Sequence, residues 1–187
     1  MASVATTAML GPGSKKASAA GQVAIGVTET IASFNPYADS ISMGYAIWCQ
    51  VYGCLAFYDY EKGDYVGGLD ERWEVDKADN NIWTFHLKRG VKRHNDGKEL
   101  TAEDVVHSVD RVNNDPQSKQ KQNVSPIKEV VALDKYTVKM VTKEPTASLL
   151  EFIFDRVIIS GKDLYDKYGA REVDRKAPWG WGPYKLK

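Results

Sequence analysis

Residues 83–105 read WTFHLKRGVKRHNDGKELTAEDV, and this stretch decides most of the fold prediction. Apolar residues alternate with polar ones from Trp83 to Leu87, which predicts a strand with one buried and one solvent-facing side. Thr101 is followed three residues later by Asp104, the spacing of a capping box at the start of a helix. The stretch therefore predicts a strand, a basic turn and a capped helix, in that order.

The capped helix is predicted to span residues 102–112. Val105, Val109 and Val112 recur at helical spacing and form one apolar face. The Asn-Asn-Asp-Pro stretch at 113–116 then supplies a stop signal, because proline cannot continue a helix.

Two hairpins flank this helix in the sequence. The first pairs residues 73–75 with 83–87 through the turn-forming link 76–81, and its inner face is aromatic. The second lies within residues 127–141, with residues 134–135 as a two-residue turn.

Short strands and helices mix along the rest of the chain, which predicts an α/β or α+β sheet domain rather than a repeated βαβ series. The patterns predict, in order, a strand at 22–27, a helix at 40–53, a polar loop at 59–68, a helix at 146–154, a buried strand at 157–160, a helix at 162–168, and a glycine-rich turn at 178–187 leading into a strand that the end of the chain cuts off.

Composition limits the function classes. With 187 residues and 43% hydrophobic content, the chain can bury one substantial core, as one domain or one lobe of a larger protein. Lys and Arg number 25 and Asp and Glu number 25, so no net charge draws the protein to nucleic acid or to an anionic membrane. No apolar run reaches 18 residues, so no transmembrane segment is expected.

Residues 1–20 are rich in Ala, Ser and Thr and end in an A-x-A-like pattern at residues 17–19. The segment is interpreted either as the remnant of an export signal or as a disordered tail, and it is excluded from the fold. The structured domain is expected to span residues 21–187.

Cys49 and Cys54 are predicted to be buried and unpaired. They lack a CxxC or metal-ligand spacing. If their stretch is helical, positions five apart point about 140° apart around the axis, which disfavours a disulfide.

Five blocks follow one another in the sequence: RWEV at 72–75, WTFHLKRGVK at 83–92, DGKELTAEDVV at 96–106, KEP at 143–145 and GPYK at 182–185. Together they resemble the extracytoplasmic solute-binding protein family 5, the peptide, dipeptide and nickel receptors of ATP-driven importers. Five blocks in fixed order are far more specific than one short motif. Two departures stand out: Arg93 replaces the aromatic residue of the family turn, with Asn95 inserted after it, and Trp181 stands where the family has threonine.

The resemblance implies an α/β fold, namely an incomplete mixed-sheet lobe of a two-lobed periplasmic-binding-protein fold of type II-like, cluster C architecture. Residues 21–187 would form the N-terminal part of lobe 1. The implied ligand is a short peptide or similar small solute, and the implied partner is the membrane permease of an ABC importer. No cofactor, metal or nucleic acid is expected. The implied location is periplasmic or extracellular, either free or membrane-associated.

By the same resemblance, the loop after the first strand lines the ligand cleft. Its candidate ligand-binding residues are Thr28, Glu29, Thr30 and Ile31. Glu29 can pair with a ligand ammonium group, although a solvated loop acid is the alternative.

Aromatic residues supply the other candidates. Tyr45, with Trp48 and Tyr52 at helical spacing, lines either the cleft or the core. Trp179 and Trp181, flanked by glycine, are candidates for the cleft or the hinge.

Two alternatives remain. An enzyme such as a hydrolase is disfavoured because His86, His94 and His107 share no catalytic or metal-binding spacing, and His107 is expected at the surface. The other alternative is an incomplete structural or interaction fragment that binds no ligand. Such a fragment would expose apolar surface and self-associate.

Overall fold

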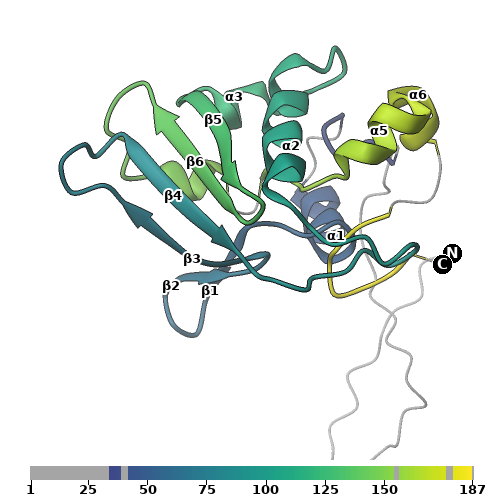
Figure 1. The fold of residues 1–187 in the computed structure, drawn as a ribbon, viewed down its shortest axis with the longest axis horizontal. Coiled ribbons are helices and arrows are strands. Elements are labelled where there is room, and N and C mark those ends of the chain that lie inside the picture. The colour runs from purple at the N-terminus through teal and green to yellow at the C-terminus, as the bar shows by residue number, and fades with distance from the viewer. Residues whose placement is uncertain (1–33, 39–41, 154–155, 176–178, 187) are drawn as a thin grey trace, which may run out of the picture.

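The computed structural model describes residues 34–38, 42–153, 156–175 and 179–186 (Figure 1). Its elements, in chain order, are α1 (Ser42–Val51), β1 (Ala56–Asp59), β2 (Asp64–Gly67), β3 (Asp70–Val75), β4 (Ile82–Leu87), α2 (Ala102–Asn114), α3 (Lys121–Val124), β5 (Ile127–Asp134), β6 (Thr137–Thr142), α4 (Leu149–Ile153), α5 (Lys162–Tyr168) and α6 (Ala170–Val173). The strand predicted at 22–27 lies outside the described residues.

Four strands form an antiparallel sheet in the order β3-β4-β6-β5, which confirms both predicted hairpins. Phe85 of β4 is fully buried and pairs with Trp73 of β3 on one side and Val138 of β6 on the other. Full burial of a side chain of this size stabilises the folded state by about 1.5–3 kcal/mol relative to leaving it exposed. The turn between β5 and β6 lies one residue later than predicted, at 135–136.

Helix α2 packs beside β5, and α5 and α6 lie on the side of α2 away from the sheet (Figure 1). Thr101 and Asp104 form the predicted capping box, and the three valines are buried. The helix extends two residues beyond the predicted end, to Asn114, because Asp115 rather than Asn113 terminates it. The second oxygen of Asp104 accepts a hydrogen bond from the Lys162 amide at 2.9 Å, so the capping residue also holds the start of α5.

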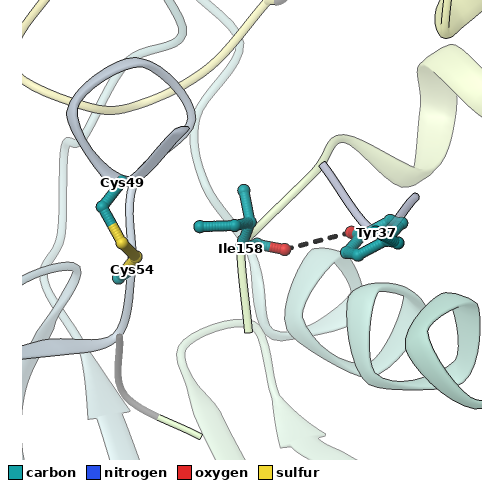
Figure 2. Close-up of a disulfide and its surroundings, with 4 residues drawn as sticks. All are labelled: Tyr37, Cys49, Cys54 and Ile158. Carbon is teal, nitrogen blue, oxygen red and sulfur yellow. Dashed lines mark hydrogen bonds between the residues drawn. A yellow bond between two sulfur atoms is a disulfide. The ribbon is translucent and has the colours of Figure 1, made fainter. Parts of the chain in front are cut away.

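The prediction of unpaired cysteines is wrong, because Cys49 and Cys54 form a disulfide (Figure 2). The angular argument assumed that both residues share a helix. Instead α1 ends at Val51, and Gly53 turns the chain with a φ of 100°, so Cys54 lies outside the helix with its Cα 5.2 Å from that of Cys49.

Three further elements differ from the prediction. The polar loop at 59–68 contains most of the β1–β2 hairpin, in which Tyr58 pairs with Tyr65. The predicted strand at 157–160 contributes a single bridge, between Ile158 and Cys54. The described residues 179–186 contain no strand, because their amides bind the end of a helix instead.

Candidate functional site

The predicted ligand-binding residues divide into two groups. Thr28, Glu29, Thr30 and Ile31 lie outside the described residues. Tyr45, Trp179 and Trp181 are described: Tyr45 lies in the N-terminal half of α1, and Trp179 and Trp181 lie two residues apart in a segment without regular secondary structure.

Tyr45 is 9% exposed, and the guanidinium of Arg156 lies over its ring at 5.2 Å. Its helical neighbours Trp48 and Tyr52 belong to the main hydrophobic core, as the core interpretation of the stripe predicted. Tyr45 therefore lies beside a cation at the edge of the core.

Trp181 lies between two parts of the chain that are distant in sequence. Its amide donates to the carbonyl of Tyr52 at 2.8 Å, and the amide of Gly182 donates to Val51 at 3.1 Å. These are carbonyls at the C-terminus of α1, where a helix lacks internal partners. On the other side, the indole Nε1 of Trp181 donates to the carbonyl of Lys98 at 3.0 Å.

Glycine is required on both sides of Trp181 because the backbones approach closely. A Cβ on Gly180 would lie 2.1 Å from the carbonyl oxygen of Val51, and a Cβ on Gly182 would lie 2.3 Å from that of Gln50. The Gly-Trp-Gly pattern therefore reflects docking onto α1.

A buried arginine lies next to this segment. Arg93 is 1% exposed and forms paired hydrogen bonds with Asp163, at 2.8 Å from each terminal nitrogen, and with Asp96. Its guanidinium carbon lies 5.4 Å from the ring of Trp181 and 5.9 Å from that of Trp179. The two family departures, Arg93 and Trp181, are thus in contact. We call Arg93, Asp96, Asp163, Trp179 and Trp181 the Arg93 cluster.

Electrostatics hold the Arg93 cluster in its charged form. Burial by itself would raise the pKa of Asp163, but hydrogen bonds from Arg93 and Lys98 lower this pKa to about 2. Burial likewise opposes the charge of Arg93, and the two carboxylates outweigh it and raise the arginine pKa. Both partners stay ionised at neutral pH.

Tyr37 connects the segment at 34–38 to residues 158–160. Its hydroxyl donates to the carbonyl of Ile158 at 3.0 Å (Figure 2). The same hydroxyl shares a 2.7 Å hydrogen bond with Ser160. Complete burial raises the pKa of Tyr37 to about 12, despite the bond to Ser160. Residues 34–38 are therefore held against residues 158–160.

A groove of about 750 Å³ lies between the C-terminal part of α2 and α6. Within it, Arg111 pairs with Asp115 and lies 3.4 Å from Asp174. Asn35 donates to Asp115 at 3.3 Å. Most of the residues that line the groove are polar or charged, and its buried charges Arg111, Asp115 and Asp174 are paired with one another.

The three histidines lie in separate surroundings. His86 pairs with Glu74 at 3.0 Å, and His94 contacts the carbonyl of Gly182 at 2.6 Å. The expected exposure of His107 is wrong: it is half-buried, with its ring centroid 5.0 Å from that of Tyr165, and burial and Arg111 lower its pKa. In the described ranges, no group of three or more His, Cys, Asp or Glu residues could hold a metal.

The sequence made Trp179 and Trp181 candidates for the cleft or the hinge, but the contact of Arg93 with both of them was not predicted. The signal was an arginine at a position where the family has an aromatic residue. An arginine at an aromatic position can take over a packed position, and a buried arginine needs acidic partners.

Comparison with known proteins identifies the family. The sequence model for bacterial extracellular solute-binding proteins, family 5 Middle, matches residues 64–187. The dipeptide-binding protein of Escherichia coli (strain K12) is 31% identical over 175 residues, covering 82% of this chain and 32% of that protein. The di/tripeptide-binding protein 2 of Pseudomonas aeruginosa (strain UCBPP-PA14) is 28% identical over 160 residues, covering 72% and 29%. The chain spans about a third of the length of these relatives.

Solved structures share the fold. OppA of Burkholderia pseudomallei matches with a TM-score of 0.72 and 26% identity over 82% of this chain and 33% of its own. The periplasmic binding protein DppA of Helicobacter pylori, in complex with the peptide STSA, matches with a TM-score of 0.71 and 26% identity over 83% of this chain and 34% of its own. The mixed helix and sheet architecture is therefore part of a periplasmic-binding-protein lobe, although every strand pair among the described residues is antiparallel. The chain belongs to the bacterial extracellular solute-binding proteins of family 5.

Proposed function

We propose that this chain is part of the substrate-binding component of an ABC importer and captures short peptides outside the cytoplasm. The observation that carries the proposal is the family match over residues 64–187, together with the 31% identity to a dipeptide-binding protein. The second curated relative is named for di- and tripeptides. Both names favour a short peptide over other solutes.

The disulfide supports a location outside the cytoplasm. Disulfides persist in the periplasm and outside the cell, whereas cytosolic thiols are kept reduced. Cys49 and Cys54 are the chain's two cysteines, and they are bonded to each other. Among the described residues, no helix has both the length and the apolar character to cross a bilayer. We therefore propose a periplasmic or extracellular receptor that delivers ligand to a membrane permease.

The proposed mechanism is capture by closure. A peptide binds to one lobe, a second lobe closes over it, and the permease recognises the closed form. The ligand contacts proposed for this lobe are Thr28, Glu29, Thr30, Ile31, Tyr45, Trp179 and Trp181. Of the aromatic residues, the half-buried Trp179 offers apolar surface to the ligand, whereas Tyr45 and Trp181 are buried in the core or at its edge. Glu29 pairs with the ligand ammonium group, and no covalent chemistry is needed.

Thermal unfolding with added solutes tests the proposal. The probes are Ala-Ala, Ala-Ala-Ala, the nickel–histidine complex and maltose. Saturable stabilisation by a peptide, about 2.7 kcal/mol at a hundredfold excess over Kd, is expected. N-acetyl-Ala-Ala is the matched control, because it lacks the ammonium group.

Each outcome has a defined meaning. If only the nickel–histidine complex or only maltose stabilises the protein, that class of solute and not a peptide is the ligand. No stabilisation by any probe, with self-association in gel filtration, would favour a fragment that binds no ligand. Hydrolysis of the peptides, followed by mass spectrometry, would establish an enzyme instead.

A further inference from the structure

Arg93 contacts three separate parts of the chain. Its own backbone closes the turn at 93–98, donating to Lys98 at 2.8 Å and accepting from Gly97 at 2.9 Å. Its side chain reaches Asp163 in the first turn of α5 and the two tryptophan rings of residues 179–182. One buried side chain therefore joins three segments that are far apart in sequence.

The geometry of the contact is specific to a guanidinium group. The planar fork donates to both oxygens of Asp163 and both oxygens of Asp96, while its central carbon lies 5.4 Å from the ring of Trp181 and 5.9 Å from that of Trp179. The fit extends to the backbone, because a Cβ on Gly161 would lie 2.2 Å from Nη1 of Arg93. A lysine could not make this set of contacts, since its ammonium is a point charge on a flexible stem.

Residues 179–182 are held by hydrogen bonds to this turn as well as to the end of α1. The amide of His94 donates to the carbonyl of Gly180 at 3.1 Å, and the His94 ring donates from Nε2 to the carbonyl of Gly182. The Trp181 indole binds Lys98, as described above. Each of these groups lies within the 93–98 turn, which Arg93 fixes to α5.

Trp179 and Trp181 differ in exposure. Trp181 is 4% exposed and its indole N–H is bonded within the chain, whereas Trp179 is half-buried against the small cluster of Leu164, Tyr165 and Val173. Part of the Trp179 side chain therefore remains exposed, and a ligand can contact that part while Trp181 keeps its own contacts.

We propose that Arg93 is a positioning residue of the ligand site, which sets the placement of residues 179–182 and so the orientation of the Trp179 ring. This inference rests on the proposed function, because it assigns Trp179 to the ligand-facing wall. Arg93 does not touch ligand; it acts through the two tryptophans and through Asp163.

The test compares Arg93→Lys with wild type and with Lys162→Gln. Lys162 pairs with Asp166 on the exposed face of the same helix α5, so its substitution removes an ion pair without touching the Arg93 cluster. Two quantities are measured at 10 °C on folded protein: the Kd for Ala-Ala by calorimetry, and hydrogen exchange of the Trp181 indole N–H by NMR, assigned with Trp181→Phe.

Arg93→Lys is expected to weaken Ala-Ala binding about tenfold or more and to accelerate Trp181 indole exchange by a similar factor. Lys162→Gln is expected to leave both quantities within about twofold of wild type. A lower unfolding temperature with unchanged affinity and unchanged exchange would reduce Arg93 to a structural residue and overturn the inference.

Two further cases need a separate experiment or interpretation: a variant that does not fold, and a wild type that does not bind Ala-Ala. If Arg93→Lys does not fold, Asp163→Asn replaces it, since Arg93 then keeps Asp96; wild-type affinity and exchange in that variant would also refute positioning. If wild type itself does not bind Ala-Ala while Arg93→Lys accelerates the indole exchange, the peptide function fails and Arg93 still positions residues 179–182.

Discussion

Cys49 and Cys54 are joined by a disulfide that encloses the residues whose carbonyls hold the C-terminal segment. Residues 50–52, inside this small loop, accept amide hydrogen bonds from residues 181, 182 and 184. Gly53, also inside the loop, accepts a bond from the amide of Ile159 at 3.0 Å. The disulfide therefore fixes a helix end on which two distant segments dock.

Removing the disulfide is expected to destabilise the protein. The double variant Cys49→Ala/Cys54→Ala should lose about 2 kcal/mol of unfolding free energy, the loop-closure entropy for a ring of this size. Urea denaturation measures the loss. A reductant should lower the stability of wild type by a similar amount and leave the stability of the double variant unchanged. If the reductant lowers the stability of both proteins, its effect does not come from cleaving the Cys49–Cys54 disulfide.

Gly182→Ala is expected to displace the C-terminal segment. The added Cβ would lie 2.3 Å from the Gln50 carbonyl oxygen, and backbone cannot move aside as a flexible side chain can. The expected cost is about 1–3 kcal/mol, as for overpacking in a core. Gly63→Ala is the control: its Cβ would meet open space, so only the strain of its φ of 66° remains, about 1 kcal/mol. Equal losses in the two variants would contradict the docking argument.

Tyr37→Phe is expected to cost about 1–3 kcal/mol, because the fully buried carbonyl of Ile158 and hydroxyl of Ser160 lose a partner. Tyr60→Phe removes the same hydroxyl from a side chain that is 90% exposed, and it should leave the stability unchanged. Chemical denaturation of the three proteins provides the comparison. An unchanged unfolding free energy in Tyr37→Phe would show that the hydroxyl does not hold residues 34–38 in place.

Asp70 is expected to make stability depend on pH. It is fully buried at the start of β3. Burial raises the pKa of Asp70 to about 7, against smaller lowering effects of Lys88 and of the backbone amides of Asp70 and Gly68. The folded state therefore binds more protons than the unfolded state between about pH 4 and 7, and stability falls as pH rises through this window.

Asp70→Asn should abolish this fall, which amounts to at most about 4 kcal/mol for a shift of this size. Glu71→Gln, on the same strand but exposed, is the control and should keep the wild-type dependence. Urea denaturation at pH 4, 5.5, 7 and 8 measures the effect. A parallel pH profile for Asp70→Asn and wild type would exclude Asp70 as the titrating group.

The sheet and α2 could be predicted from the sequence because the residues that specify each strand and the helix start are close together in the chain. Alternation from Trp83 to Leu87 and the Thr101–Asp104 capping box specify a strand and a helix start within a few residues. The β1–β2 hairpin was not predicted because each of its strands has only four residues, too few to show a clear alternation of apolar and polar residues. The strand predicted at 157–160 is wrong apart from one bridge. The apolar residues that suggested it are buried in the core but are not paired with a neighbouring strand.

The sequence alone determined the family, the main sheet and the capped helix, since each depends on residue types at short, fixed spacing. Only the tertiary structure decided the disulfide, the burial of Arg93 and the docking of residues 179–184 on α1. Those features join residues 5 to more than 130 positions apart, and whether such residues meet depends on where turns such as Gly53 direct the chain.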